Sequence, residues 1–431
     1  MLQTFKNAWK IEDLRKKIIF TAIVLVIYRL GAAIAVPFIQ PEALKAMISA
    51  DNGNMLGYLN LVSGGAFANA TLFALGVIPY INSSIIITLL TVAIPYLENL
   101  SKEGEEGRRK IARITRYVAV GIGFVISIGY YFTLRNYGTL MYTKGLEGFF
   151  AAVVIIVTFV AGSLLLMWMG EQIDKKGIGN GVSLIIFTGI VSRFPQTVST
   201  FVDMVKRGID GEVINFVLVP VFIIFAVAVV AFAVVLNNAE RRIPVQYAKR
   251  VVGRKMMGGQ STYLPIKVNM SGVMPIIFAS ALVSIPGTIR AFFNVTSEVW
   301  VKILNVFNYN GFVYAVVYAV LIVVFNYFYV TMQYNPVEIA NNLRTNNGVI
   351  PGFRPGKQTQ DFIAKVISKL TFIGALFLVV VAILPIITGN LTGKAIQLGG
   401  TSILIVVGVA LETAQVLESQ MVMRHHKGFL E

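Results

Sequence analysis

Residues 77–81 read V-I-P-Y-I, and residues 273–277 read V-M-P-I-I. Each segment lies in the second apolar span of one five-span half of the chain. A proline inside a membrane helix removes a backbone hydrogen bond and interrupts the helix. Interrupted helices at corresponding places in two halves are typical of inverted repeats with a pathway at their interface. The sequence therefore predicts a pathway between residues 1–205 and residues 206–431.

The composition is that of a membrane protein. Hydrophobic residues make up 56% of the 431 residues and charged residues only 13%, and the mean hydropathy is +0.73. A water-soluble domain could not bury so much apolar surface. Most of the ten apolar spans have the ~20 residues that a helix needs to cross the hydrocarbon layer. They lie at about 18–36, 72–94, 117–134, 149–169, 180–200, 214–236, 268–289, 312–332, 366–387 and 401–417.

The span count predicts an all-α polytopic fold with ten transmembrane helices in two inverted five-helix halves. Before the first span, Leu2, Phe5 and Trp9 recur at helical spacing among lysines, which favours a short helix on the membrane surface. With the N-terminus in the cytosol, most of the 37 Lys and Arg residues fall in the tails and the even-numbered connections. The positive-inside rule therefore places both termini in the cytosol.

Two cytosolic connections, at about 237–268 and 333–365, are longer and more basic than topology requires. The first holds Arg241, Arg242, Lys249, Arg250 and Arg254 among turn-forming prolines and glycines. The second contains P-G-F-R-P-G-K at 351–357, where two prolines and two glycines favour a tight turn around its arginine. We interpret both as docking surfaces. The net charge of +16 follows from topology and suits anionic lipid, so no specific nucleic-acid ligand is expected.

No enzymatic, cofactor or metal motif is complete. The phosphate-loop-like G-F-R-P-G-K-Q-T at 352–359 lacks the required spacing, and the only histidines, His425 and His426, lie in a polar tail. We therefore expect no catalytic residue, no cofactor and no metal. A secondary transporter with inverted repeats is the alternative, but such carriers use polar or charged groups at mid-bilayer. Ionisable residues are scarce in the spans, and Arg29 and Glu412 lie toward span ends.

Branched aliphatic residues recur at four-residue spacing in two spans. Val77 and Ile81 share one helix face, and Ile186 and Ile190 share another. Such side chains, converging from several helices, form a constriction that excludes water and ions by dewetting. Ordinary helix packing gives the same pattern, so both interpretations stay open.

A segment of twelve residues, L-V-S-G-G-A-F-A-N-A-T-L at 61–72, separates the first two spans. It is too short to cross a membrane and too apolar for an exposed loop. Irregular backbone at membrane depth is tolerated where protein surrounds it. The composition therefore favours a re-entrant segment buried in protein.

Seven motifs occur in the order known from one family. They are S-G-G-A at 63–66, L-G-V-I-P-Y-I at 75–81, K-E-G-E-E-G-R-R-K-I at 102–111, G-I-G-N-G at 177–181, L-P-I-K-V-N at 264–269, P-G-F-R-P-G at 351–356 and G-G-T-S-I-L-I-V-V at 399–407. Through them the chain resembles the SecY/Sec61-alpha family over nearly its whole length. The resemblance implies a clam-like bundle around an hourglass pore. Such a channel passes unfolded secretory preproteins across the bacterial plasma membrane and releases membrane segments laterally into lipid.

The resemblance also implies roles for single residues. A pore ring would comprise Val77, Ile81, Ile186, Ile190, Ile277 and Ile405. A plug, residues 61–72, would include Leu61, Ser63, Gly64, Gly65, Phe67 and Leu72. The second and third spans, facing the seventh and eighth, would form a lateral gate.

Partners are implied by the same resemblance. The SecA ATPase motor and the ribosome would dock on the basic loops through Arg241, Arg242, Lys249, Arg250, Arg254 and Arg354. Signal sequences and preproteins would enter the pore. SecE would clamp the halves, and SecG would lie at the side.

Overall fold

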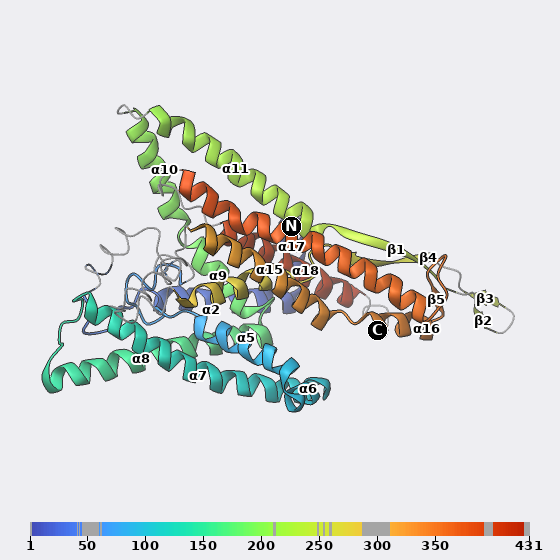
Figure 1. Cartoon of the computed structure of the whole chain (residues 1–431), viewed down its shortest axis with the longest axis horizontal. Helices are drawn as coiled ribbons and strands as arrows, with labels where there is room; N and C mark the ends of the chain where they lie inside the picture. Colours follow the sequence, from blue (N-terminus) through green and yellow to red (C-terminus); the bar gives the residue numbers. More distant parts are fainter. Residues whose placement is uncertain are drawn as a thin grey trace.

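The computed structural model describes residues 2–40, 42, 44, 60, 63–209, 213–247, 250–252, 255–257, 261–286, 311–391 and 400–425. Long helices lie side by side along one axis (Figure 1). The helices between residues 78 and 176 occupy one side of this bundle, and most of those after residue 213 occupy the other. The strands project from one end, here called the sheet end.

Each predicted span coincides with a helix or a pair of helices. These are α2 (Glu12–Gly31), α5 (Ile78–Ala93), α7 (Glu105–Asn136), α8 (Gly145–Lys176), α9 (Gly181–Val191) with α10 (Phe194–Ile209), α11 (Val213–Asn238), α12 (Met274–Val283), α15 (Phe312–Gln333), α17 (Lys357–Leu391) and α18 (Gly400–His425). Among the described residues, seven helices are long and apolar enough to span a membrane. The pair of α5 and α6 (Pro95–Lys102), bent by 100°, is an eighth candidate. The predicted helical membrane fold is confirmed.

Three boundaries differ from the predicted ones. Residues 72–77 form turns, so the second span becomes helical only at Ile78. The fifth span is broken after α9, and Arg193 lies in the break before α10. The predicted division between residues 205 and 206 falls within α10 rather than between helices.

The two prolines of the repeated motif do not interrupt their helices, so the prediction of a proline inside each helix was wrong in this respect. Pro79 and Pro275 each occupy the second residue of a helix, α5 and α12, where no intrahelical N–H bond is lost. Val77 and Val273 are the N-caps and share a φ of −94°. The motif therefore starts a helix at two corresponding places.

Five short strands occur in the basic loops, which the sequence reading left without regular structure. Strand β1 (Glu240–Tyr247) pairs antiparallel with β4 (Ser261–Lys267) and with β5 (Gly348–Val349), in the order β4-β1-β5. Strands β2 (Arg250–Val252) and β3 (Lys255–Met257) form a separate hairpin. Because β5 follows α16 (Pro336–Thr345), the β1–β5 pairing joins the two loops into one subdomain.

A hydrophobic core binds this subdomain to the membrane helices. Inward-facing Ile243 and Val245 of β1 pack with Leu343 of α16 and with Ile363 and Leu370 of α17. The other strand residues of β1 are exposed or half-buried, which is the alternation expected of a sheet with one covered face. The loop subdomain is thus anchored on the second half of the chain.

The largest core lies between the two sides of the bundle. Its buried residues come from α2, α5, α8, α9, α11, α12, α15, α17 and α18. Direct contacts between the two sides run along α5 with α12 and along α9 with α18. These two seams lie within the core between the halves.

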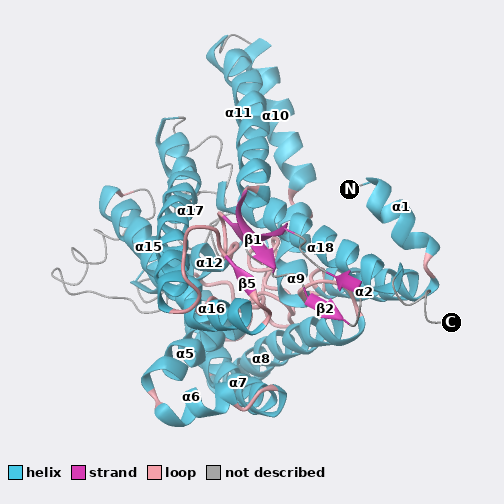
Figure 2. Cartoon of the chain, turned by 90° about the vertical axis from the view of Figure 1, so that its right-hand side faces the viewer, coloured by secondary structure: helices cyan, strands magenta, loops and turns pink. Residues whose placement is uncertain are grey.

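The predicted surface helix is present as α1 (Leu2–Lys10). It packs on α2 and α18 through a small core in which Ala8, Leu14, Ile178 and Leu417 are buried. Trp9 remains half-exposed. Figure 2 shows α1 at the side of the bundle, next to α2.

Candidate pore constriction and plug segment

All six predicted ring residues belong to the core between the halves. Val77, Ile81, Ile186 and Ile405 are buried in it, whereas Ile190 and Ile277 are half-buried at its edge. They come from four helix regions: the start of α5, α9, the start of α12, and α18. The structure therefore places in one hydrophobic core side chains that lie more than 300 residues apart in the chain.

Ile81 and Ile277 occupy equivalent positions, each the fourth residue of its helix. The backbone N–H of Ile81 donates to the carbonyl of Val77 at 3.0 Å, and that of Ile277 donates to the carbonyl of Val273 at 3.3 Å. The preceding residues, Gly76 and Gly272, both have positive φ, 57° and 65°. The repeat observed in the sequence thus extends by one glycine and by a common backbone path.

The helix α9, which carries Ile186 and Ile190, has a fixed entrance. Asn180 caps it, accepting from the N–H of Ser183 at 3.0 Å, and Asp174 of α8 accepts from the N–H of Gly181 at 2.7 Å. Gly179, with φ of 77°, makes the bend that the sequence G-I-G-N-G favours. A Cβ at Gly181 would lie 2.1 Å from the carbonyl oxygen of Gly170, so α9 and α8 meet backbone to backbone.

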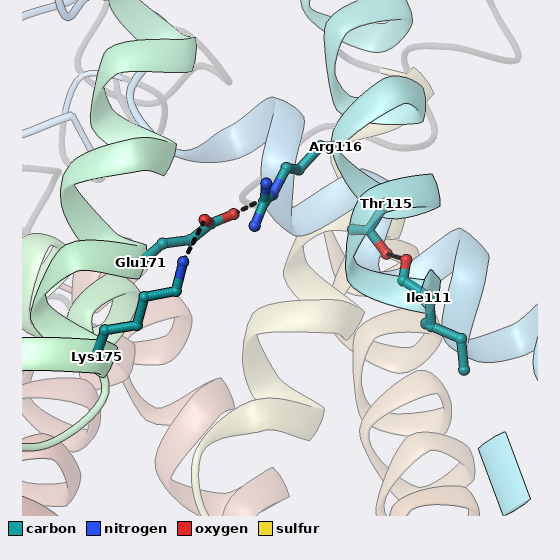
Figure 3. A network of polar contacts seen from close by, with 5 residues as sticks. All are labelled: Ile111, Thr115, Arg116, Glu171 and Lys175. Carbon is teal, nitrogen blue, oxygen red and sulfur yellow. Dashed lines mark hydrogen bonds and ion pairs between the residues drawn. The ribbon is translucent and has the colours of Figure 1, made fainter. Parts of the chain in front are cut away.

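An ion pair ties α7 to α8 near this entrance (Figure 3). Arg116 Nε lies 2.5 Å from Glu171 Oε1, and Lys175 Nζ lies 4.0 Å from the other oxygen of Glu171. Glu171 is only 18% exposed, so its pairing with Arg116 offsets part of the cost of burying the carboxylate. The pair fixes the helix that supplies Asp174 to α9.

The described part of the predicted plug is compact and largely buried. It consists of turns, with Ser63, Gly64 and Phe67 buried and Gly65 and Leu72 half-buried; Leu61 lies outside the described residues. Phe67 stacks on Tyr130 of α7, with ring centroids 4.4 Å apart, and the Tyr130 hydroxyl donates to the Phe67 carbonyl at 2.6 Å.

The plug segment also touches the ring region. Ala66 belongs to the same core as the six predicted ring residues. Gly64, with φ of 65°, lies so close to α9 that a Cβ there would be 2.7 Å from the Cα of Gly189. Gly189 stands between Ile186 and Ile190 on α9. Residues 63–72 are thus enclosed by protein, as the composition predicted, and their re-entry into the membrane stays a prediction.

The loop surface presents some of the predicted docking arginines. Arg241 and Arg242 are exposed on β1, and Arg242 Nε lies 2.7 Å from Glu240 Oε1. Arg250 lies in β2, where only the backbone is described, and Lys249 and Arg254 lie outside the described residues.

Arg354 sits at the tip of a built turn. Gly352 and Gly356 on either side have positive φ of 85° and 104°, as the P-G-F-R-P-G sequence predicts. Phe353 stacks on Phe362 with centroids 4.2 Å apart, and the Arg354 carbonyl accepts from Thr359 Oγ1 at 2.9 Å. The turn is anchored on α17 while the arginine side chain stays exposed.

Sequence reasoning missed two features of the site. Arg193 falls inside the fifth predicted span, and a cation followed by a proline two residues later could have indicated the break there. A buried polar network was also missed: Ser271 Oγ donates to Asn326 Oδ1, and Asn326 Nδ2 donates to the Thr371 carbonyl at 2.8 Å. This network ties the approach to α12 to α15 and α17. Isolated polar residues within apolar spans were its only signal.

Within the described ranges, no group of three His, Cys, Asp or Glu side chains is placed to hold a metal ion. The site is an apolar core at an interface between helices, and Ala66 of the turn-rich plug segment belongs to it.

A sequence model of the SecY family matches residues 71–414. Protein translocase subunit SecY of Bacillus licheniformis is 43% identical, and the alignment covers 100% of both chains. A solved structure concerned with how the SecY plug domain stabilises the closed translocation channel has a TM-score of 0.63 at 19% identity, covering 95% of this chain and 92% of that one. Sec61 from a canine ribosome–channel complex of the endoplasmic reticulum has a TM-score of 0.55 at 18% identity, covering 95% and 93%.

The fold and these relatives define a polytopic membrane channel of the protein-conducting class. With relatives of this identity aligned along its full length, the chain belongs to the SecY family of protein translocase subunits. Its predicted fold class, ten helices in an all-α membrane bundle, is confirmed, with the small loop sheet as an addition. The transporter alternative gains no support.

Proposed function

We propose that this chain forms the pore through which unfolded secretory preproteins cross the bacterial plasma membrane, and from which membrane segments leave sideways into lipid. In this proposal the halves are residues 1–205 and 206–431, inverted around an hourglass pore. The chain acts as a conduit and not as an enzyme. A cytosolic partner supplies the energy for transport, because the chain has no nucleotide-binding motif of its own.

One observation carries the proposal: six branched aliphatic residues from four helix regions meet with Ala66 of the plug segment in one core between the halves. An apolar constriction excludes water and ions without a specific contact to what passes through it. It therefore suits a substrate whose side chains vary along its length. Val77, Ile81, Ile186, Ile190, Ile277 and Ile405 are the proposed seal, and residues 61–72 the proposed plug.

The contact between α5 and α12 supports a lateral gate. This seam joins the two halves through few elements, and α12 is the shortest of the helices that coincide with predicted spans. Parting the seam would open a path to lipid beside the pore. We propose that α5 and α7 face α12 and α15 across this gate.

The topology follows from charge. The sheet end carries Arg241, Arg242 and Arg354, and the positive-inside rule assigns this end to the cytosol together with both termini. We propose that SecA and the ribosome dock there, because the exposed arginines stand on an anchored subdomain. The ribosome is supported by the solved ribosome–channel complex of Sec61. SecE and SecG as small subunits, and anionic lipid as surroundings, complete the assembly.

The proposal is tested by reconstituting the chain with its small subunits in liposomes. We expect a signal-bearing preprotein to become protected from protease only when ATP, the motor and an intact signal sequence are all present. Absence of protection from correctly oriented protein, together with gradient-driven uptake of a small solute, would overturn the proposal in favour of a transporter.

Docking is tested by Arg354→Glu. Reversing an exposed charge at the tip of an anchored turn should leave folding intact and reduce motor-driven transport at least tenfold, the effect of about 1.4 kcal/mol in binding. The matched control is Lys144→Glu, a charge reversal at an exposed residue in the connection between α7 and α8. Equal transport by the two variants would remove Arg354 from the docking surface.

A further inference from the structure

Arg29 is a cation within the first predicted span, 18–36. It lies in the last turn of α2, and its guanidinium is in no ion pair within the described part of the chain. Placing a charge in a membrane segment is costly, and such residues are kept where they serve a purpose. A cation near the end of a span commonly extends its side chain toward the membrane surface.

The structure gives it a different contact. Arg29 Nη1 donates to the carbonyl oxygen of Gly64 in the plug segment at 3.4 Å. Gly64 also lies against α9, where a Cβ on it would be 2.7 Å from the Cα of Gly189. Gly64 therefore contacts both the arginine of α2 and the backbone of the helix that carries Ile186 and Ile190.

The end of α2 is itself fitted to the segment that follows the plug. Tyr28, which is buried, packs against Phe73 with ring centroids 5.9 Å apart. A Cβ at Gly31 would lie 2.2 Å from the Phe73 ring. The backbone of Leu72 also donates to the Ile34 carbonyl at 2.9 Å. These contacts fix the backbone from which Arg29 extends.

We propose that Arg29 is the positioning residue that keeps the plug closed, by holding Gly64 against Gly189. This inference rests on the proposed role of residues 61–72. A charge-assisted hydrogen bond is stronger than a neutral one, but 3.4 Å is long for an N–H to oxygen bond. The contact therefore favours the closed plug without preventing its displacement. Substrate entry must break this contact together with the contacts between Phe67 and Tyr130.

The absence of cysteine in the chain permits a direct test. Ala68→Cys places the only thiol in the plug segment, at a residue that is buried in the closed structure. In reconstituted complexes, its rate of reaction with a membrane-impermeant maleimide reports plug opening. We expect Arg29→Gln to speed labelling about tenfold, the loss of one hydrogen bond to a charged group, and to raise resting ion conductance.

Arg135→Gln is the matched control, because Arg135 is an exposed arginine in the last turn of α7, a helix that packs beside the plug. It should leave labelling unchanged. Arg29→Lys keeps the cation but not the planar fork, and should give an intermediate rate; it also serves if Arg29→Gln does not yield folded protein.

Labelling at the parent rate in Arg29→Gln or, failing that, in Arg29→Lys would overturn the positioning role. A separate measurement tests the plug itself: an engaged preprotein should accelerate labelling of Ala68→Cys in the otherwise unchanged chain. If it does not, the plug assignment fails, and that failure is distinguishable from failure of Arg29 alone.

Discussion

The helix starts of α5 and α12 have one backbone design and opposite directions. In both, a glycine with positive φ precedes a valine cap and a proline at the second helical residue. The helix α5 leads to α6 at the sheet end, whereas α12 follows β4 and leads away from that end (Figure 1). Two similar six-residue segments, 76–81 and 272–277, thus lie on opposite sides of one interface, here called its two walls. Inversion of a repeat requires this arrangement.

The approaches to the two starts differ. A Cβ at Gly76 would lie 3.8 Å from the Cα of Ser63 in the plug segment. Before α12, Ser271 bonds to Asn326, and Asn269 Nδ2 donates to Asn237 Oδ1 at 2.8 Å. Buried side-chain hydrogen bonds therefore hold both approaches: those before α5 lie within the turn-rich segment or reach α7, and those before α12 reach α15.

The largest effect on folding should come from a second proline introduced one turn further into each helix. Ser83→Pro in α5 and Ala279→Pro in α12 each remove an interior hydrogen bond at a buried residue, at a cost of about 3 kcal/mol or more. We expect little folded protein from either variant by size-exclusion chromatography in detergent. As controls, Pro79→Ala and Pro275→Ala should fold normally. A well-folded Ser83→Pro would show that α5 does not begin where the structure places it.

A smaller and unequal effect is expected at the equivalent ring positions. Ile81→Ser should lower the free energy of unfolding by about 2–3 kcal/mol, because Ile81 is buried, and Ile277→Ser by less, because Ile277 is half-buried. Both should raise resting ion conductance in planar bilayers, since polar linings wet more easily. The matched control is Ile86→Ser, a change at a lipid-accessible face of α5. Unchanged conductance in both ring variants would exclude them from the seal.

Loss of the hydrogen bonds among Ser271, Asn326 and Thr371 should destabilise the α12 wall and not the α5 wall. Asn326→Leu leaves buried partners unpaired and should cost about 2 kcal/mol, whereas Asn341→Leu on the exposed face of α16 should cost little. Thermal unfolding measures the cost. In a hydrogen-exchange experiment, we expect faster exchange in α12 and unchanged exchange in α5. Equal acceleration in both helices would contradict separate anchoring.

The smallest effect concerns the glycines that precede each helix. Gly76→Ala and Gly272→Ala both force a side chain into the left-handed region, at about 1–2 kcal/mol each. A Cβ at either position meets nothing closer than 3.8 Å, so backbone strain alone should set the cost. The two shifts in melting temperature should therefore agree. A twofold difference would show that the two starts are not equivalent.

Hydropathy sufficed to locate the helices, because each span must satisfy its own backbone bonds in lipid. Local turn chemistry sufficed for Gly179 and for the turn at Arg354. The strands were not predicted, since Pro244 and two adjacent arginines in β1 obscure the alternation of Ile243 and Val245.

Other features depend on contacts between distant residues. Nothing local to Gly64 shows that it meets Gly189, and nothing local to Arg29 shows that it reaches Gly64. The ring residues could be proposed from resemblance, but their meeting in one core is a property of the fold. The proline positions were misread because periodicity does not show where a helix begins within an apolar run.

The pairing of β1 with β5 has a mechanical consequence. It joins the two loops into one sheet whose core packs on α16 and α17, with Arg354 in the turn that precedes α17. The same sheet continues through β4 into residues 268–273 and so into α12. A force applied to this sheet would therefore reach α12 through the backbone of the connecting residues. It would reach α5, on the opposite side of the interface, only through side-chain contacts.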